Sequence, residues 1–170
     1  EMKVGTVDLL LLVRNHPNYD SNKALVATTE KDYQKRLDGL KSEIEKIQEE
    51  GKKLADQMRN PRLAENAKKK IEKDLTDIQT KFVQGQQKLR SEAMRSQQDL
   101  QELEGRLLKT TTADLRKRVA KYAEANGYDF IFDAGAAPYA KKSFDVSNEI
   151  LKAMGVDPKD AKGKEKDEGK

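Results

Sequence analysis

The side chains that most often carry catalysis or bind metals are scarce in this sequence. His16 is the only histidine among 170 residues, and there is no cysteine. A zinc site made of histidine and cysteine, a cysteine nucleophile and a disulfide framework are therefore excluded. Because no nucleophile paired with a base, glycine-rich phosphate loop or group of carboxylates is visible either, the sequence predicts neither an enzyme nor a bound cofactor or metal. We expect His16, beside Pro17, to end a helix and pack its ring on a small folded body; a pH sensor is the weaker alternative.

The chemistry that the residues do offer is electrostatic binding. From Lys31 to Arg95 there are 17 basic and 12 acidic residues, a net charge of +5, whereas the rest of the chain carries −1 of the total of +4. A basic surface attracts acidic polypeptides at long range and weakens with salt. The residues expected to contact such a client are Lys68, Lys69, Lys70, Lys81, Val83, Lys88, Arg90 and Met94.

These charges have two other interpretations, of which the sequence favours only the first. A solvated helix face is the commoner role of a run such as Lys68-Lys69-Lys70. Nucleic acid is not predicted as a partner, because the charge is mixed and aromatic residues are not interleaved with it.

We expect the basic residues between 31 and 95 to lie on long helices. Hydrophobic residues make up 35% of the chain and charged residues 38%, which is typical of long helices or of disorder. Pro61 is the only proline between Ser21 and Gly127, and apolar residues on either side of it recur at steps of three and four, the spacing of a coiled-coil seam. The predicted seam contains Leu37, Leu40, Ile44, Ile47, Leu54, Ile71, Leu75, Ile78 and Phe82.

An antiparallel hairpin is the preferred arrangement of this seam. If the chain turns back at Asn60-Pro61, facing residues have numbers that sum to about 121 or 122, so that Ile44 faces Ile78. Gly51 then faces Ile71 and Gly85 faces Leu37, which places small residues against large ones. The alternative is a parallel coiled coil between chains, interrupted by the proline.

The two chain ends are expected to form the small body. The predicted organisation is a strand and short helix in residues 1–20, a hairpin over 21–126 with its turn near 59–62, strands and a helix in 127–155, and a disordered tail over 156–170. Within the body, Asp8 is expected to cap the short helix, residues 128–133 to form a strand, and Asp145 or Ser147 to cap a last helix that stops at Gly155. Such a chain buries too little apolar surface to be stable as a monomer, so we expect the body to be a subunit interface. Its apolar residues are Val4, Val7, Leu10, Phe130, Phe132, Phe144 and Ile150.

The order of these elements resembles the Skp/OmpH-like periplasmic chaperone family. The resemblance spans about residues 3–154 and is carried by Lys3-Val-Gly-Thr-Val-Asp8, His16-Pro-Asn-Tyr19, Tyr128-Asp-Phe-Ile-Phe-Asp133, Ala137-Pro-Tyr139 and Asp145-Val-Ser-Asn-Glu-Ile-Leu151. It implies a mainly α fold with a small β body, assembled as a jellyfish-like homotrimer whose helical arms surround a cavity. Glycines 51, 85 and 105 depart from the expected helical composition and leave the stiffness of the arms open.

The resemblance also implies a function. It is that of an ATP-independent periplasmic holdase, which keeps unfolded outer-membrane β-barrel proteins from aggregating before membrane insertion and whose signal peptide has been removed. The family brings no catalytic residues. A membrane surface or lipopolysaccharide is a further partner that it suggests, but no basic residues carry over for that role. The alternative from another class is a structural coiled-coil spacer or scaffold without chaperone activity.

Overall fold

The structure is a computed structural model that describes residues 1–163. Of the described residues, 74% are helical and a few form one small parallel sheet, which confirms the predicted mainly α fold with a small β component. Two units can be distinguished, and their boundaries fall inside the two long helices. The body unit comprises Glu1–Leu25 together with the chain from Glu104 onward, and the arm unit comprises Val26–Leu103.

The N-terminal elements of the body unit follow their local sequence signals. Strand β1 covers Val4–Val7 and helix α1 covers Leu9–Arg14. The Asp8 side chain caps α1 by accepting a hydrogen bond of 3.1 Å from the backbone N–H of Leu11. The predictions of this strand, this helix and this cap are therefore confirmed.

The C-terminal elements pack beside them. Strand β2, Phe130–Asp133, lies parallel to β1, with Val4 opposite Phe130. Two short 3-10 turns, Ala134–Ala136 and Lys142–Phe144, then lead to helix α4, Ser147–Ala153. β2 is two residues shorter than the predicted strand, because the N–H groups of Asp129 and Phe130 both bond to the carbonyl of Lys3.

The start of α4 differs in detail from the expected cap at Asp145 or Ser147. Val146 precedes the first helical residue, and the Asp145 carboxylate accepts the N–H of Ser147 at 2.9 Å. Ser147 itself lies inside the helix, where its hydroxyl accepts the N–H of Asp8 at 2.8 Å. This hydroxyl therefore joins the two chain ends instead of capping its own helix. Gly155, at φ +82°, follows α4 in the left-handed conformation that favours glycine.

The core of the body unit draws on three distant parts of the chain. Its buried residues are Val7, Leu11, Leu12, Leu115, Val146, Ile150 and Leu151. Leu115 belongs to helix α3, Glu65–Ala125, so the C-terminal part of this helix completes the core. The body unit is consequently held together by long-range burial of apolar surface.

The segment after α4 differs from the expected disordered tail. Val156 and Ala161 pack against the core, and Lys162 bonds to Asn15 through backbone and to Asp20 through its ammonium group. These side-chain and backbone partners offset the lack of large apolar residues in this segment. Residues 156–163 thus lie on the body unit, and the rest of the predicted tail, 164–170, lies outside the described residues.

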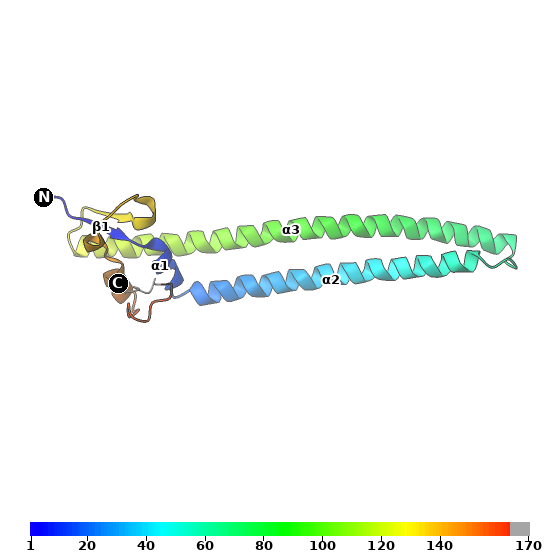
Figure 1. The fold of residues 1–170 in the computed structure, drawn as a ribbon, viewed down its shortest axis with the longest axis horizontal. Coiled ribbons are helices and arrows are strands. Elements are labelled where there is room, and N and C mark those ends of the chain that lie inside the picture. Colours follow the sequence, from blue (N-terminus) through cyan, green and yellow to red (C-terminus); the bar gives the residue numbers. More distant parts are fainter. Residues whose placement is uncertain (164–170) are drawn as a thin grey trace, which may run out of the picture. The chain divides into compact units, whose positions relative to one another are not determined.

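The arm unit is an antiparallel pair of helices (Figure 1). Helix α2, Tyr19–Met58, and helix α3 are joined by residues 59–64, where the Asn60 side chain accepts the N–H of Arg62 at 3.0 Å. The turn at Asn60-Pro61 occurs where it was predicted. Both helices keep the heptad spacing that the sequence indicated.

The predicted register between the helices is wrong by about one heptad. A Cβ atom on Gly51 would lie 3.2 Å from Ile78 instead of meeting Ile71, and one on Gly85 would lie 3.1 Å from Ile44 instead of meeting Leu37. Ile44 therefore faces Gly85 and not Ile78. Because the seam repeats every seven residues, a displacement of seven brings the same apolar stripes together, and only the length of the turn selects between the two registers.

Candidate functional site

The contact between the two arm helices is a narrow apolar strip. Three of the predicted seam residues are buried, Ile44 at 9%, Ile71 at 8% and Ile78 at 9% exposure. The other predicted members are half-buried, and they are Leu37, Leu40, Ile47, Leu54, Leu75 and Phe82. A two-helix contact cannot cover more than one side of each helix, so most of the arm surface remains open to a partner.

The strip becomes polar in the part of the arm unit that contains Tyr33. The Tyr33 hydroxyl donates to Asp99 at 3.2 Å, and Arg36 lies 3.7 Å from Glu92. Burial, followed by the hydrogen bond to Asp99, raises the pKa of the Tyr33 phenol. Ser96 is 4% exposed, and its hydroxyl has no hydrogen-bond partner among the described residues. Sequence analysis missed this polar layer, although the change from apolar to polar seam positions after Leu89 could have indicated it.

The predicted client-contact residues lie mainly on the exposed surface of α3. Val83 is 46% and Met94 61% exposed, so neither contributes substantially to the helix contact. Lys68 is half-buried and pairs with Glu65 at 3.6 Å, which supports its role in a solvated helix face. The remaining basic residues are exposed, and they are Lys69, Lys70, Lys81, Lys88 and Arg90.

Two hollows on the arm meet at Gln79. The first, of about 500 Å³, lies beside the helix contact. Its lining residues are Ile47, Gln48, Gly51, Leu75, Ile78, Gln79 and Phe82. The second, of about 320 Å³, lies on α3. Its lining residues are Thr76, Gln79, Thr80, Val83 and Gln84.

The body unit exposes an apolar surface that a single chain leaves uncovered. Phe130 is 50% and Phe132 52% exposed, and their rings stack with centroids 5.6 Å apart. Leu10 and Phe144 are 65% and 44% exposed, while Val4 is half-buried. Tyr139, 79% exposed, is a further aromatic residue of the body unit that the sequence analysis did not single out for binding.

Val7 and Ile150, two of the apolar residues predicted for the body, lie in its interior. Val7 is 4% and Ile150 1% exposed, and both belong to the core of the single chain. Their side chains therefore stabilise the body unit from inside and are covered before any second chain arrives.

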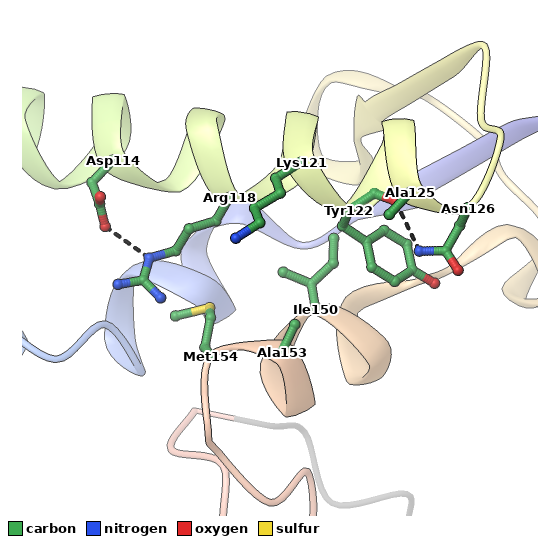
Figure 2. Close-up of a pocket in the computed structure, with 9 residues that line it drawn as sticks. All are labelled: Asp114, Arg118, Lys121, Tyr122, Ala125, Asn126, Ile150, Ala153 and Met154. Carbon is green, nitrogen blue, oxygen red and sulfur yellow. Dashed lines mark hydrogen bonds and ion pairs between the residues drawn. The ribbon is translucent and has the colours of Figure 1, made fainter.

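A cavity of about 460 Å³ separates the end of α3 from α4 in the body unit (Figure 2). Arg118, Lys121 and Tyr122 point into it from α3, and they are faced by Ile150 of α4 and by Met154, which directly follows α4. The cavity is thus basic on one wall and apolar on the other. Nothing in the sequence marks it, because its walls come from segments about thirty residues apart.

Asp114, at one end of this cavity, connects it to the only histidine. Its carboxylate lies 2.6 Å from Nε2 of His16 and accepts a bond of 2.9 Å from Nε of Arg118. The His16 bond, and then the Arg118 bond, lower the pKa of Asp114. Because the N–H of Asn18 donates to Nδ1 of His16, the ring hydrogen is on Nε2 and points at the carboxylate. His16 is 6% exposed, so its buried ring ties the segment before α2 to α3.

Residues 1–163 contain no group of three or more histidine, cysteine, aspartate or glutamate side chains arranged to hold a metal ion. Within the same residues, no helix has the length and apolar character needed to cross a membrane.

The comparison with protein families accounts for both units. The model for the family described as Outer membrane protein (OmpH-like) matches residues 3–154. The chain belongs to the OmpH-like family. This family is known for periplasmic chaperones of outer-membrane proteins, not for enzymes, and it binds unfolded outer-membrane proteins. A comparison of this OmpH-like chain with individual curated proteins gave no match.

Proposed function

We propose that this OmpH-like chain is an ATP-independent periplasmic holdase. In this proposal three copies associate through their body units, and the arm units enclose an unfolded outer-membrane β-barrel protein and keep it from aggregating before membrane insertion. The observation that carries the proposal is the division of apolar surface between the units. The arm gathers most of its apolar residues in one strip and presents a largely charged surface, whereas the body exposes stacked aromatic rings.

The arm surface suits transient capture. Its net charge of +5 over residues 31–95 attracts acidic clients over a distance set by ionic strength. Its exposed apolar side chains, such as Val83 and Met94, add contacts that are individually weak. Several such contacts acting together give avidity without holding the client irreversibly, and release then needs no nucleotide.

Aggregation of a denatured client tests the holdase activity. An outer-membrane β-barrel protein in urea is diluted into buffer with the OmpH-like protein and without ATP, and light scattering is followed. We expect stoichiometric protein to suppress scattering, and suppression to weaken as salt is raised. Unchanged scattering would contradict the proposal and favour the structural coiled-coil spacer or scaffold.

The mass of the assembly in solution tests the association of body units. The proposal expects three times the chain mass of 19.3 kDa. Replacing Phe130 and Phe132 together by serine removes exposed apolar surface without disturbing the core, and it should shift the assembly toward single chains. A wild-type protein that stays at the mass of one chain would remove the enclosed space on which the proposal depends.

A further inference from the structure

The hollows that meet at Gln79 differ chemically from the rest of the arm. Of the 65 residues from 31 to 95, 29 are charged, yet none of the residues that line the two hollows carries a charge. A hollow on α2, with the same volume of about 500 Å³ as the larger of these two, is instead lined almost entirely by charged residues. It is lined by Ser42, Glu45, Lys46, Glu49, Glu50 and Lys53. We call the two uncharged hollows together the Gln79 groove.

The close helix contact accounts for the apolar part of this groove. Gly51 has no side chain, so Ile78 approaches its backbone and a Cβ atom there would lie 3.2 Å from Cγ2 of Ile78. Ile47 and Phe82 are half-buried, like the other members of the strip, and they line the same hollow as Gly51. Apolar surface is therefore accessible beside the seam.

Amide and hydroxyl groups supply the polar part. The side-chain amides of Gln48, Gln79 and Gln84 make no hydrogen bond to another residue within 1–163, so each can offer donors and an acceptor to a partner. The Thr76 and Thr80 hydroxyls donate to carbonyls one turn earlier in α3, which leaves their oxygens as acceptors. A peptide backbone, which also carries one donor and one acceptor per residue, matches this set.

The flanking charge favours one kind of polypeptide. No acidic residue occurs between Asp77 and Glu92, and this interval contains Lys81, Lys88 and Arg90. Acidic residues of a bound chain would be attracted to these cations. A charged side chain placed in the groove itself would lose solvation without meeting an opposite charge.

We propose that the Gln79 groove binds an extended, uncharged segment of the unfolded client, with an apolar side chain beside Gly51 and Phe82 and the client backbone on the glutamine amides. This proposal rests on the proposed function and adds to it a defined point of contact. It separates two roles of the arm: general attraction by net charge, and local selection of uncharged segments at the groove.

Charge substitutions of either sign at the groove distinguish these roles. Gln79→Glu and Gln79→Lys are compared with Gln98→Glu and Gln98→Lys, because Gln98 is also an exposed glutamine on α3 and lines neither hollow. The probe is a fluorescently labelled outer-membrane β-barrel protein diluted from urea, and its dissociation constant is measured by anisotropy. Circular dichroism of each variant checks that the helices are retained.

We expect both Gln79 variants to weaken binding, each by about fivefold, since either charge would lose its solvation when the client covers this exposed position. The Gln98 variants should change binding by less than about twofold, in opposite directions that follow the sign of the charge. Wild-type-like or tighter binding by Gln79→Lys would overturn the groove while leaving the holdase proposal intact. Absence of client binding by the wild-type protein would overturn both.

Discussion

The body unit and the arm unit use similar helices but bury apolar surface in different ways. The body buries seven apolar residues, which come from β1, α1, α3, α4 and the residue directly before α4. Four of the seven are less than 2% exposed. The arm buries three isoleucines, each at 8% or 9%, along a single strip. The chain as a whole has few apolar residues, and their distribution decides the outcome. Concentrated in a core they stabilise the body unit, and spread along one strip they leave most of the arm surface open to partners.

The largest effect is expected from a deletion in the core of the body unit. Leu115 is 0% exposed, so Leu115→Ala removes buried methyl groups and leaves a cavity, at a cost of about 3 kcal/mol in the free energy of unfolding. Urea denaturation followed by circular dichroism measures this cost. Leu108→Ala, on the same helix but 52% exposed, is the matched control and should change stability by less than about 0.5 kcal/mol. Equal effects of the two substitutions would contradict the assignment of the core.

A deletion in the arm strip should have a smaller and more local effect. Ile44→Ala removes the side chain that packs on Gly85, and water can enter the exposed strip, so we expect about 2 kcal/mol. Hydrogen exchange should accelerate in residues 26–103 and remain unchanged in the amides of α1 and α4. Acceleration throughout the chain would show that the two units unfold together.

The glycines of the long helices should separate into two classes. A Cβ atom on Gly39 has no neighbour within 4 Å, so Gly39→Ala should stabilise the arm by about 0.8 kcal/mol through helix propensity. The Cβ atom of Gly51→Ala would lie 3.2 Å from Ile78, and this crowding should cancel most of the gain. Thermal unfolding of both variants measures the difference. Equal stabilisation would show that the strip does not need a glycine at position 51.

The smallest effect is expected at Asp114. Its pKa is lowered below 3.8 in the folded chain, so its contribution to stability is complete well above pH 3.8 and is lost as the pH falls through the folded value. Because the side chain is 43% exposed, the contribution should stay below about 0.5 kcal/mol at pH 7. Asp114→Asn should therefore differ most from wild type near neutral pH and converge with it below pH 3.8 in chemical denaturation. A constant difference across this range would show that the loss comes from packing and not from the carboxylate.

Local signals in the sequence predicted much of the fold. The Asp8 cap, the turn at Asn60-Pro61 and the stop at Gly155 depend on neighbouring residues, and each occurs where it was expected. The register between the arm helices could not be predicted in the same way, because a seven-residue repeat fits two registers equally well. Gly51 and Gly85 contact isoleucines one heptad away from the expected partners.

The candidate site was less accessible to sequence reasoning. Exposed cations on α3 follow from their helical positions, and so does the exposure of Val83 and Met94. The Gln79 groove depends on the corrected register, since Ile47 of α2 and Phe82 of α3 line one hollow only in that alignment. The bond between His16 and Asp114 joins residues 98 positions apart, and no local pattern indicates such a pair.

Site-specific photo-cross-linking tests most directly the claim that the arm holds the client and the body joins the copies. Benzoylphenylalanine replaces Gln84 on the arm in one protein and Phe132, which is 52% exposed on the body, in another. With an unfolded outer-membrane β-barrel protein present, the account predicts cross-links to the client from position 84 and to a second copy of the chain from position 132. Capture of the client from position 132, with none from position 84, would contradict it.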